Sequence, residues 1–576
     1  MPRRNTFSWN SIITGFSKSG FVDEAYCLFR TMPERDQCSW NSMISGFAQR
    51  ERFEEAIECF VGMHREDFVL NEYSYPSALS ACAGLVDLNL GTQIHASIAK
   101  SPFLFDVHMG SALIDMYSKC GSVLEAEMVF EGMNEKNIVT WNSLITCYEQ
   151  NGPASKALEL FVGMMDLGFK PDEVTLASVV SACATLVAIR EGSQIHSFVI
   201  KNDKFRDDLV LSNALVDMYA KGRRIKEARR VFDAMPVRNV VTDTSMVSGY
   251  AKANGENEQA LELFCLLKKD SIWPTHYTFG NVLNACANLA NLELGKQAHA
   301  HVLKHGFQFE SGPESDVFVG NSLVDMYTKC GAIEDGFRVF RNMVERDNVS
   351  WNAMIVGYAQ NGYGTEALDL FRRMLVSGEK PDHVTMIGVL CACSHVGMVE
   401  EGRRYFNSMT VEHGLKPTKD HYTCMVDLLG RAGRLYEAKK LIDSMPMEPD
   451  NVIWGSLLGA CRIHQHVEMG MHAAEKLMEI DPENSGPYVL LSNMYAEVGI
   501  WREVVKVRKM MRERGVVKQP GCSWIEINSK VHIFMAKDRN HPHRKRICDL
   551  LRTLRAQMKR VEYIVDVRCT AHNPMM

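Results

Sequence analysis

The stretch from Ser111 to Phe130 reads SALIDMYSKCGSVLEAEMVF. The chain contains it twice more in altered form, as NALVDMYAKGRRIKEARRVF from Asn213 and as NSLVDMYTKCGAIEDGFRVF from Asn321. One phrase that returns at long intervals is typical of a repeat architecture, in which each repeat is one supersecondary unit. The sequence therefore predicts an array of similar units and not a set of unrelated domains.

Two further phrases alternate with the first. SWNSIITGFSKSG, which begins at Ser8, returns with small changes at Ser39, Thr140 and Ser350. SACAGLVDLNLGTQIHASI, which begins at Ser80, returns at Ser181 and Asn284. Trp40 and Trp141 mark one full cycle, which three unit types of about 35, 35 and 31 residues fill.

Each unit is predicted to be a helical hairpin, as residues 138–172 illustrate. Apolar residues with helical spacing run from Val139 to Tyr148, and Asn151-Gly152-Pro153 interrupts them. The helical spacing resumes from Ala157 to Met164 and ends before Lys170-Pro171-Asp172. One hairpin cannot bury its apolar face alone, so stacked neighbours must share a continuous core.

These features resemble the pentatricopeptide repeat. The unit lengths, the W-N-[SA]-[LMI]-I start and the Lys-Pro-Asp endings at 170–172 and 380–382 carry the resemblance, and the cycle is similar to the plant P-L-S subclass. A tetratricopeptide array is the competing helical hairpin, but most units lack its W-x-x-L-G-x-x-Y start. The resemblance implies an all-α, right-handed superhelical solenoid of stacked helix-turn-helix repeats that binds single-stranded RNA. Mitochondrial C-to-U editing factors of land plants are similar.

The resemblance gives about thirteen repeats in residues 1–450. The units are S 6–36, P 37–71, L 72–106, S 107–137, P 138–172, L 173–208, S 209–239, P 240–275, L 276–316, S 317–347, P 348–382, L 383–418 and S 419–450. Residues 451–484 and 485–517 resemble the paired E motifs, which are tetratricopeptide-like hairpins. Residues 518–576 form the third predicted segment.

In this family the fifth and last residues of a unit face a concave groove and contact one base. The resemblance therefore predicts base recognition by Asn10/Asp36, Asn41/Asn71, Ser111/Asn137, Asn142/Asp172, Asn213/Asn239, Thr244/Thr275, Asn321/Asp347, Asn352/Asp382 and Thr423/Asp450. Apolar second residues would sandwich each base, at Phe7, Val139, Val210, Phe318 and Val349. A single asparagine such as Asn142 is more often a helix cap or a solvated polar group. Its recurrence with a terminal Asp or Asn favours base recognition.

The resemblance also implies a target. Asn with Asp prefers U, Asn with Asn a pyrimidine, Ser or Thr with Asn prefers A, and Thr with Asp prefers G. Thr244/Thr275 predicts no base, and the L units are left open. With parallel polarity and the final S unit four nucleotides before the edited C, the site is U-Y-n-A-U-n-Y-n-n-U-U-n-G-n-n-n-C.

Bulk composition limits the alternatives. The formal net charge is −6 and the pI is near 6.4, so an RNA site must be a local stripe within a mildly acidic protein. No apolar run approaches the roughly 18 residues of a membrane span. Seventeen cysteines include no C-x-x-C pair. Cys82, Cys183, Cys286 and Cys393 share one repeat position and Cys120 and Cys330 another, which indicates structural thiols in a reducing compartment.

The histidines of the L units recur with the repeat. His95, His196 and His299 lie three units apart and cannot converge on one metal. We predict that they pack or form hydrogen bonds between repeats.

The tail resembles the opening of the DYW deaminase domain at Lys518–Trp524 and at His541-Pro542. A zinc deaminase needs His-x-Glu followed by Pro-Cys-x-x-Cys. Only seven residues follow Cys569, so we expect an E+ or truncated DYW-like segment without the deaminase zinc site. The pairs His64/Glu66 and His466/Glu468 have no following C-x-x-C, and we interpret them as coincidences inside repeat helices. The sequence predicts no enzyme, no cofactor and no metal.

Two irregularities qualify the register. The chain opens with MPRRNTFSWN, and Met-Pro-x-Arg-Asn is how the short unit ending at Asn239 closes, so we expect a truncated N-terminus and a missing targeting presequence. In 240–275, Asp243 replaces the tryptophan of other P units, and the unit is one residue long near Ala253-Asn254. A hybrid of two repeats would explain both.

Two function classes follow from the resemblance. The first is a site-recognition factor for C-to-U editing of organellar transcripts, with a DYW-type cytidine deaminase recruited in trans and multiple organellar RNA editing factors as partners. The second is an RNA-binding protein that stabilises, splices or processes a transcript without editing. A protein scaffold would not predict the pattern at the base-recognition positions. The expected compartment is the mitochondrion or alternatively the plastid, with no membrane and no small-molecule substrate.

Overall fold

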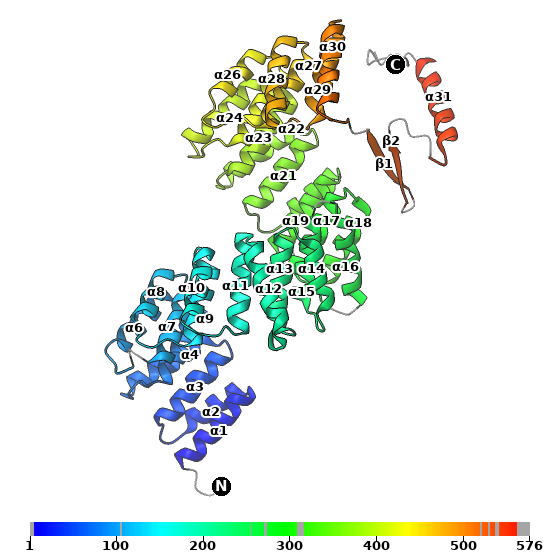
Figure 1. The fold of residues 1–576 in the computed structure, drawn as a ribbon. Coiled ribbons are helices and arrows are strands. Elements are labelled where there is room, and N and C mark those ends of the chain that lie inside the picture. The colour runs from blue at the N-terminus through cyan, green and yellow to red at the C-terminus, as the bar shows by residue number, and fades with distance from the viewer. Residues whose placement is uncertain are drawn as a thin grey trace. The chain divides into compact units, whose positions relative to one another are not determined.

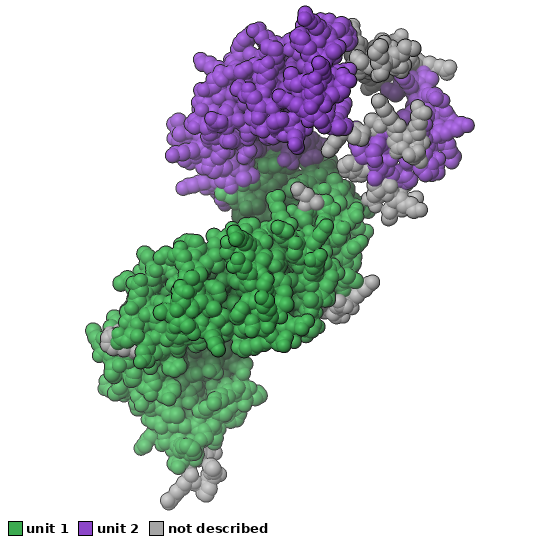
Figure 2. All heavy atoms as spheres, in the orientation of Figure 1, with its two compact units in different colours: residues 1–357 green, residues 358–576 purple. Residues whose placement is uncertain are grey.

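The computed structural model describes residues 5–103, 106–253, 255–269, 273–307, 316–518, 521–527, 530–535 and 541–560. The chain divides into two compact units, Met1–Gly357 and Tyr358–Met576 (Figure 2). Both units contain a run of helical hairpins, in which an odd-numbered A helix is followed by an even-numbered B helix (Figure 1). Within the described ranges, no helix is both long enough and apolar enough to span a membrane.

The A helices of the first unit form one row, because each contacts the A helix of the hairpin on either side. They are α1 (Thr6–Ser19), α3 (Gln37–Gln49), α5 (Ser74–Leu85), α7 (Val107–Lys119), α9 (Ile138–Asn151), α11 (Glu173–Leu186), α13 (Leu209–Lys221), α15 (Val240–Lys252), α17 (His276–Asn288) and α19 (Val317–Lys329).

Each B helix packs against its own A helix and against the next A helix along the chain. The B helices are α2 (Val22–Thr31), α4 (Phe53–Arg65), α6 (Leu88–Ile98), α8 (Val123–Gly132), α10 (Ala154–Asp166), α12 (Ile189–Lys201), α14 (Ile225–Ala234), α16 (Asn257–Lys269), α18 (Leu292–Lys304) and α20 (Ile333–Asn342); η1 (Asp203–Phe205) follows α12. In the K-C-G phrase, Gly121 and Gly331 turn the chain between A and B helices with φ of 75° and 77°, which favours glycine.

The helix α21 (Asn348–Gln360) spans the boundary between the units. The second unit continues with α22 (Gly364–Val376), α23 (His383–Val396), α24 (Val399–Val411), α25 (Lys419–Arg431), α26 (Leu435–Asp443), α27 (Asn451–Ile463), α28 (Val467–Ile480), α29 (Ser485–Glu497) and α30 (Trp501–Glu513). An antiparallel hairpin follows, with β1 (Cys522–Ile527) paired to β2 (Lys530–Met535) from Cys522 opposite Met535 to Ile527 opposite Lys530, and then α31 (Arg544–Arg560). The predicted all-α array of stacked hairpins is confirmed, with this hairpin as its exception.

The tryptophans of the W-N-S phrase join consecutive repeats. Trp40 and Trp141 pack edge-on against Phe29 and Phe130 of the preceding B helices, with ring centroids 4.7 Å apart in both pairs. Trp351 packs in the same way on Phe340 at 5.1 Å. Aromatic pairs of this geometry stabilise a core beyond their buried area. The three units that begin with this phrase therefore make the same contact with the preceding B helix.

The cysteines of the A-C phrase lie in the core. Cys82, Cys183, Cys286 and Cys393 are buried in α5, α11, α17 and α23. Burial raises the pKa of the Cys82, Cys286 and Cys393 thiols to about 12 and that of Cys183 to about 11. These four side chains are therefore neutral packing groups, which confirms the prediction of structural thiols for them.

The L-unit histidines link each B helix to the next A helix. His95 Nδ1 lies 2.8 Å from the hydroxyl of Tyr117, His196 Nδ1 lies 3.0 Å from that of Tyr219, and His299 Nδ1 lies 2.9 Å from that of Tyr327. The prediction of hydrogen bonds between repeats is confirmed. Burial lowers the pKa of His95 and of His196, so both rings favour the neutral form.

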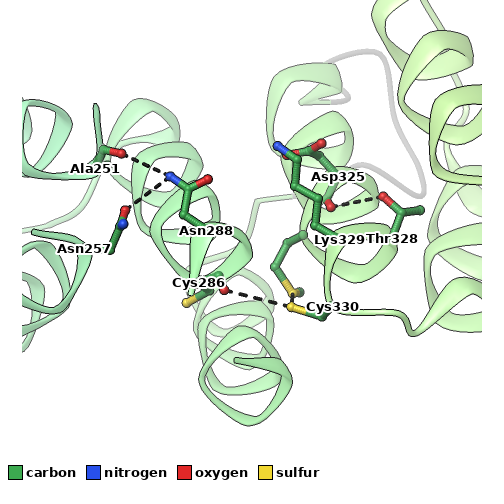
Figure 3. Close-up of polar contacts among 9 residues, drawn as sticks. Ala251, Asn257, Cys286, Asn288, Asp325, Thr328, Lys329 and Cys330 are labelled. Atoms are coloured by element: carbon green, nitrogen blue, oxygen red, sulfur yellow. Dashed lines mark hydrogen bonds and ion pairs between the residues drawn. The ribbon is translucent and has the colours of Figure 1, made fainter. Parts of the chain in front are cut away.

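The irregular unit at 240–275 keeps its place in the stack. Asp243 is buried at the tryptophan position, and the guanidinium of Arg238 lies 4.4 Å from the centre of the Phe232 ring of α14. Asn288 ties this unit to the next, because its Nδ2 donates to Ala251 O and to Asn257 Oδ1, each at 3.2 Å (Figure 3). A cavity of about 680 Å³ lies beside it.

The junction after α17 is tight as well. Cys330 Sγ, at the end of α19, lies 3.9 Å from the carbonyl oxygen of Cys286 in α17 (Figure 3). The two cysteine positions of the repeat phrases therefore meet across one interface between neighbouring hairpins.

Candidate nucleic-acid interface

The last residue of each unit begins the next A helix. Asp36, Asn137, Asp172, Asn239, Thr275, Asp382 and Asp450 are the N-caps of α3, α9, α11, α15, α17, α23 and α27. Asp172 Oδ1, for example, accepts the backbone N–H of Thr175 at 2.9 Å. Asp, Asn and Thr are preferred at this position because a side-chain oxygen satisfies an exposed helical N–H. Helix capping therefore accounts for the type of the last residue, although not for that of the fifth.

Two last residues cap with small differences. Asn71 precedes the N-cap Tyr73 of α5, and its Oδ1 accepts from the backbone of Tyr73 and of Ser74, both at 3.1 Å. Asp347 Oδ1 accepts the backbone N–H of Ser350 at 2.8 Å. The capping oxygen is in each case fixed by the helix that it begins.

Five fifth-residue amides donate to the last residue of the same unit. Asn10 Nδ2 lies 3.0 and 2.9 Å from the carboxylate oxygens of Asp36, and Asn142 Nδ2 lies 2.9 Å from each oxygen of Asp172. The same bond joins Asn321 to Asp347 (3.0 Å), Asn41 to Asn71 (3.2 Å) and Asn213 to Asn239 (3.3 Å). The structure thus brings together residues at opposite ends of one repeat.

Three other pairs differ, because their fifth residues are hydroxyls. Ser111 Oγ donates to Val107 O at 2.9 Å and Thr423 Oγ1 to Lys419 O at 3.0 Å, so both bond to their own helix. Their partners Asn137 and Asp450 cap α9 and α27. Thr244 and Thr275 meet through Thr278, whose hydroxyl lies 2.7 and 3.1 Å from theirs.

The remaining pair divides between the two compact units. Asn352 is buried in α21 of the first unit, and Asp382 caps α23 of the second.

Hydrogen bonding favours the charged form of the Asp347 carboxylate. Burial opposes ionisation of Asp347, but the backbone N–H of Ser350, the amide of Asn321 and the hydroxyl of Ser350 outweigh it and lower the pKa of this carboxyl. A carboxylate that keeps its charge offers acceptors only, which suits an N–H donor.

The second residues are exposed although they are apolar. Phe7, Val139, Val210, Phe318 and Val349 are between 44% and 77% exposed. Core side chains would be buried, so these five residues are surface groups, and their contact with bases stays a prediction. Flat or branched apolar groups at regular spacing can hold bases by their faces.

The A helices of four S units end in a cation. Lys119, Lys221, Lys329 and Arg431 occupy this place, and each forms an ion pair with an aspartate four residues earlier, at 3.0, 2.8, 2.8 and 2.8 Å respectively. A neighbouring aspartate therefore offsets the positive charge of each of these four side chains, which is consistent with the mildly acidic composition.

The sequence analysis missed the third residue of the units. Ser39, Ser74, Thr175, Thr242, Thr278, Ser350 and Thr385 each join the capping group of the preceding repeat through a side-chain hydroxyl. For Ser39 and Ser350 the signal was present in the recurring [ST]-W-N phrase, whose first letter is this residue. The other five share only a Ser or Thr three residues after the last residue of the preceding unit.

The two His-x-Glu sequences lie in different settings. His64 is within α4, as predicted, but His466 precedes α28 as its N-cap, where Nδ1 accepts the backbone N–H of Met469 at 3.3 Å. The interpretation that both lie inside repeat helices is therefore wrong for His466. In the part of the chain that the structure describes, no group of three or more His, Cys, Asp or Glu side chains could hold a metal ion.

Family models match most of the array. The model described as "PPR repeat family" matches residues 35–84, 136–185, 238–288 and 346–395. The model described as "PPR repeat" matches 7–36, 111–138, 210–240, 321–348 and 420–448, and "E motif" matches 464–526.

Curated relatives extend over nearly the whole chain. The pentatricopeptide repeat-containing protein At2g13600 of Arabidopsis thaliana is 62% identical over 539 residues, which are 88% of this chain and 77% of the relative. The putative pentatricopeptide repeat-containing protein At3g13770, mitochondrial, from the same plant is 41% identical, over 87% of this chain and 79% of its own length. A third relative, At3g57430, chloroplastic, also from Arabidopsis thaliana, is 38% identical over 99% of this chain and 65% of its own.

A solved structure is similar as well. The crystal structure of the pentatricopeptide repeat protein PPR10 from maize aligns with a TM-score of 0.49 at 16% identity, over 89% of this chain and 80% of its own.

Proposed function

Because the chain belongs to the pentatricopeptide repeat family, we propose that it is a sequence-specific single-stranded RNA-binding protein that selects sites for C-to-U editing in organellar transcripts. The observation that carries this proposal is the repeated bond between a fifth-residue amide and a last-residue carboxylate or amide. With an exposed apolar second residue beside it, each such repeat offers one base a polar edge partner and a surface for stacking.

The last residue explains how neighbouring repeats differ in preference. Its Oδ1 caps a helix, so the atom that varies is the second one, Oδ2 in aspartate and Nδ2 in asparagine. An aspartate such as Asp172 adds an acceptor, which suits the imino N–H of uracil, whereas Asn239 adds a donor. These rules support the target U-Y-n-A-U-n-Y-n-n-U-U-n-G-n-n-n-C, in which U-U-n-G next to the editing site corresponds to Asn321/Asp347, Asn352/Asp382 and Thr423/Asp450.

The C-terminal region would supply the link to editing. Residues 1–450 form the proposed RNA-binding array, 451–517 the paired E motifs and 518–576 an E+ or truncated DYW-like tail. The E-motif match at 464–526 supports recruitment of a DYW-type cytidine deaminase in trans, together with other organellar editing factors. The chain itself is proposed to carry out no chemistry.

Organellar localisation follows from the relatives. The names of two of them include the words mitochondrial and chloroplastic, respectively. We propose the mitochondrion, with the plastid as the alternative.

A binding experiment tests the first part of this proposal. The purified full-length chain is expected to bind an RNA that carries the proposed target more tightly than an RNA in which its defined letters are scrambled, and to leave every cytidine unchanged. Equal affinity for the two RNAs would overturn sequence-specific binding. Deamination by the chain alone would overturn the assignment of catalysis to a partner.

The second candidate function is stabilisation or processing of a transcript without editing. The array alone would suffice for it, because a bound solenoid can shield RNA. Comparison of organellar cDNA with genomic DNA in plants that lack the protein separates the two functions. An unedited cytidine downstream of a matching site supports the first, and intact editing with altered transcript ends supports the second.

A further inference from the structure

The amide oxygens of the fifth-residue asparagines fall into two groups. Asn142 Oδ1 accepts a hydrogen bond from Thr175 Oγ1, and Asn213 Oδ1 accepts one from Thr242 Oγ1, both at 2.6 Å. The Oδ1 atoms of Asn10, Asn41 and Asn321 are buried and have no hydrogen-bond partner among the described residues. The same residue type at the same repeat position is therefore held in two ways.

The third residue of the next repeat makes the difference. It is threonine where the amide oxygen is bonded and serine where it is not. The serine hydroxyls turn to the preceding capping residue instead, as Ser39 Oγ donates to Asp36 O at 2.7 Å, Ser74 Oγ to Asn71 O at 3.1 Å and Ser350 Oγ to Asp347 Oδ1 at 2.9 Å. Threonine has a restricted χ1, whereas serine rotates more freely between acceptors.

The threonine hydroxyl donates to a fifth-residue amide oxygen only where the preceding repeat has an amide at that position. Thr140 follows the repeat of Ser111, which has no side-chain amide, and its hydroxyl donates to Asn137 O at 2.8 Å. Thr175 has one proton to donate, and the contact with Asn142 Oδ1 is shorter than its 2.9 Å contact with Asp172 Oδ1. The bond to the amide is thus separable from the capping role that all these hydroxyls share.

The consequence concerns the direction of the amide N–H groups. In the Asn142 repeat the amide plane is held at both ends, by Asp172 on Nδ2 and by Thr175 on Oδ1. One N–H points to the carboxylate, so the other has a fixed direction. In the Asn10 and Asn321 repeats only the Nδ2 end is held. A group fixed before binding loses less entropy when it bonds to a base.

We propose that the third residue of each following repeat is a positioning residue for base recognition, in which threonine fixes the asparagine amide and serine leaves it unfixed. The base class concerned is a pyrimidine whose carbonyl oxygen accepts the fixed N–H. Repeats whose fifth residue is asparagine therefore discriminate more strongly between bases when threonine follows than when serine follows. The inference rests on the proposed function, because the direction of the amide matters only to a base that contacts it.

The chain offers a matched pair of variants for the test. Thr175→Val and Thr140→Val each remove one hydroxyl from a capping box and keep a branched side chain, but only the first releases an amide. We expect similar falls in the thermal midpoint of both. Affinities are measured for the full-length chain on a panel of RNAs that differ from the proposed target at single nucleotides. Thr175→Val should lower discrimination at one nucleotide by roughly threefold to tenfold, and Thr140→Val should leave it unchanged there.

A second pair guards against misfolding and tests the gain of function. Thr175→Ser introduces a residue that the equivalent positions already carry, and it should lose the same discrimination as Thr175→Val. Ser39→Thr should raise discrimination by about threefold at the nucleotide contacted by Asn10. Equal effects of Thr175→Val and Thr140→Val across the panel would overturn the inference while binding specificity remains. Absence of any preference in the unmodified chain would instead overturn the proposed function.

Discussion

Asn142 Nδ2 lies 2.9 Å from both carboxylate oxygens of Asp172, which stands 30 residues further along the chain. The bond closes the repeat, since it joins the fifth residue of α9 to the residue that begins α11. Asp172 serves two neighbours at once, as the partner of an amide in its own repeat and as the N-cap of the next.

The double role of Asp172 predicts how its substitution separates specificity from stability. Asparagine caps a helix about as well as aspartate, so Asp172→Asn should change the free energy of unfolding by less than about 0.5 kcal/mol. Its second atom becomes a donor, and the preference at the contacted nucleotide should relax from U to either pyrimidine. Urea unfolding and binding to U- and C-containing RNAs check the two parts, and an undiminished preference for U would contradict the assignment of Asp172.

The final S unit allows a directed change of preference. Thr423 Oγ1 now donates to Lys419 O, and Asp450 caps α27. Asparagine at position 423 would place an amide where Asn142 has one relative to Asp172. Thr423→Asn should therefore shift the preference from G toward U by roughly tenfold or more, since a good base contact is worth about 1–3 kcal/mol. Binding affinities for RNAs that differ only at that nucleotide test this shift. An unchanged preference for G in a folded variant would refute the register.

The buried L-unit histidines predict a loss of stability in mild acid. Burial lowers the pKa of His95 and of His196 in the folded chain, so the unfolded chain takes up protons first as the pH falls. Stability should be constant above the unfolded value of about 6.5 and decline as the pH falls from there through the lowered pKa. His196→Gln should reduce this decline, as measured by urea midpoints at pH 7.5 and 5.5. A decline of the same size in the variant would show that other groups cause it.

The aromatic contact between repeats predicts a large loss of stability when its tryptophan is removed. Trp141 is buried against Phe130, and Trp141→Ala would leave a cavity between α8 and α9. The free energy of unfolding should fall by about 3–5 kcal/mol. Calorimetry measures the fall, and Val162→Ala in α10, where the side chain is exposed, serves as the control that should change little.

The tail is expected to act in editing and not in RNA binding. Removal of residues 451–576 would uncover the face of α25 that packs against α27, so a cut at 450 would confuse loss of folding with loss of function. A cut after residue 517 keeps α27–α30, and it removes α31, most of whose described side chains are exposed. RNA affinity should stay within about twofold, because no base-recognition pair is lost, and editing in plants should be abolished. A collapse of affinity in a folded chain would place the tail in the RNA site.

The fold was predictable because the repeat phrases expose its periodicity. The break at Asn151-Gly152-Pro153 predicted the end of one helix and the start of the next, and α9 ends at Asn151 while α10 begins at Ala154. Helical spacing within each phrase and the same phrase in successive units determine an array of hairpins. The strands β1 and β2 were not predicted, since they lie outside the repeats and, among the described residues, pair with each other and with no further strand.

The candidate site was predictable only in part. The fifth and last residues were identified from the family pattern, but their bond depends on how the A helix and the end of the same repeat approach in space. The hydroxyl of Thr175 was missed because its choice between Asn142 and Asp172 depends on side chains 33 and three residues away. The direction of a single O–H bond has no periodic signal in a sequence.

The capping duty of the last residue restricts how such an array can evolve or be redesigned. Every proposed base-recognition pair in this chain ends in Asp, Asn or Thr, the small set of side chains that start a helix well. A larger residue that could contact a base more fully would leave the next helix without its first bond. The chemistry of helix initiation thus limits which residue types, and so which RNA preferences, the last position of a repeat can carry. A designer who substitutes this residue also changes the N-cap of the adjoining repeat.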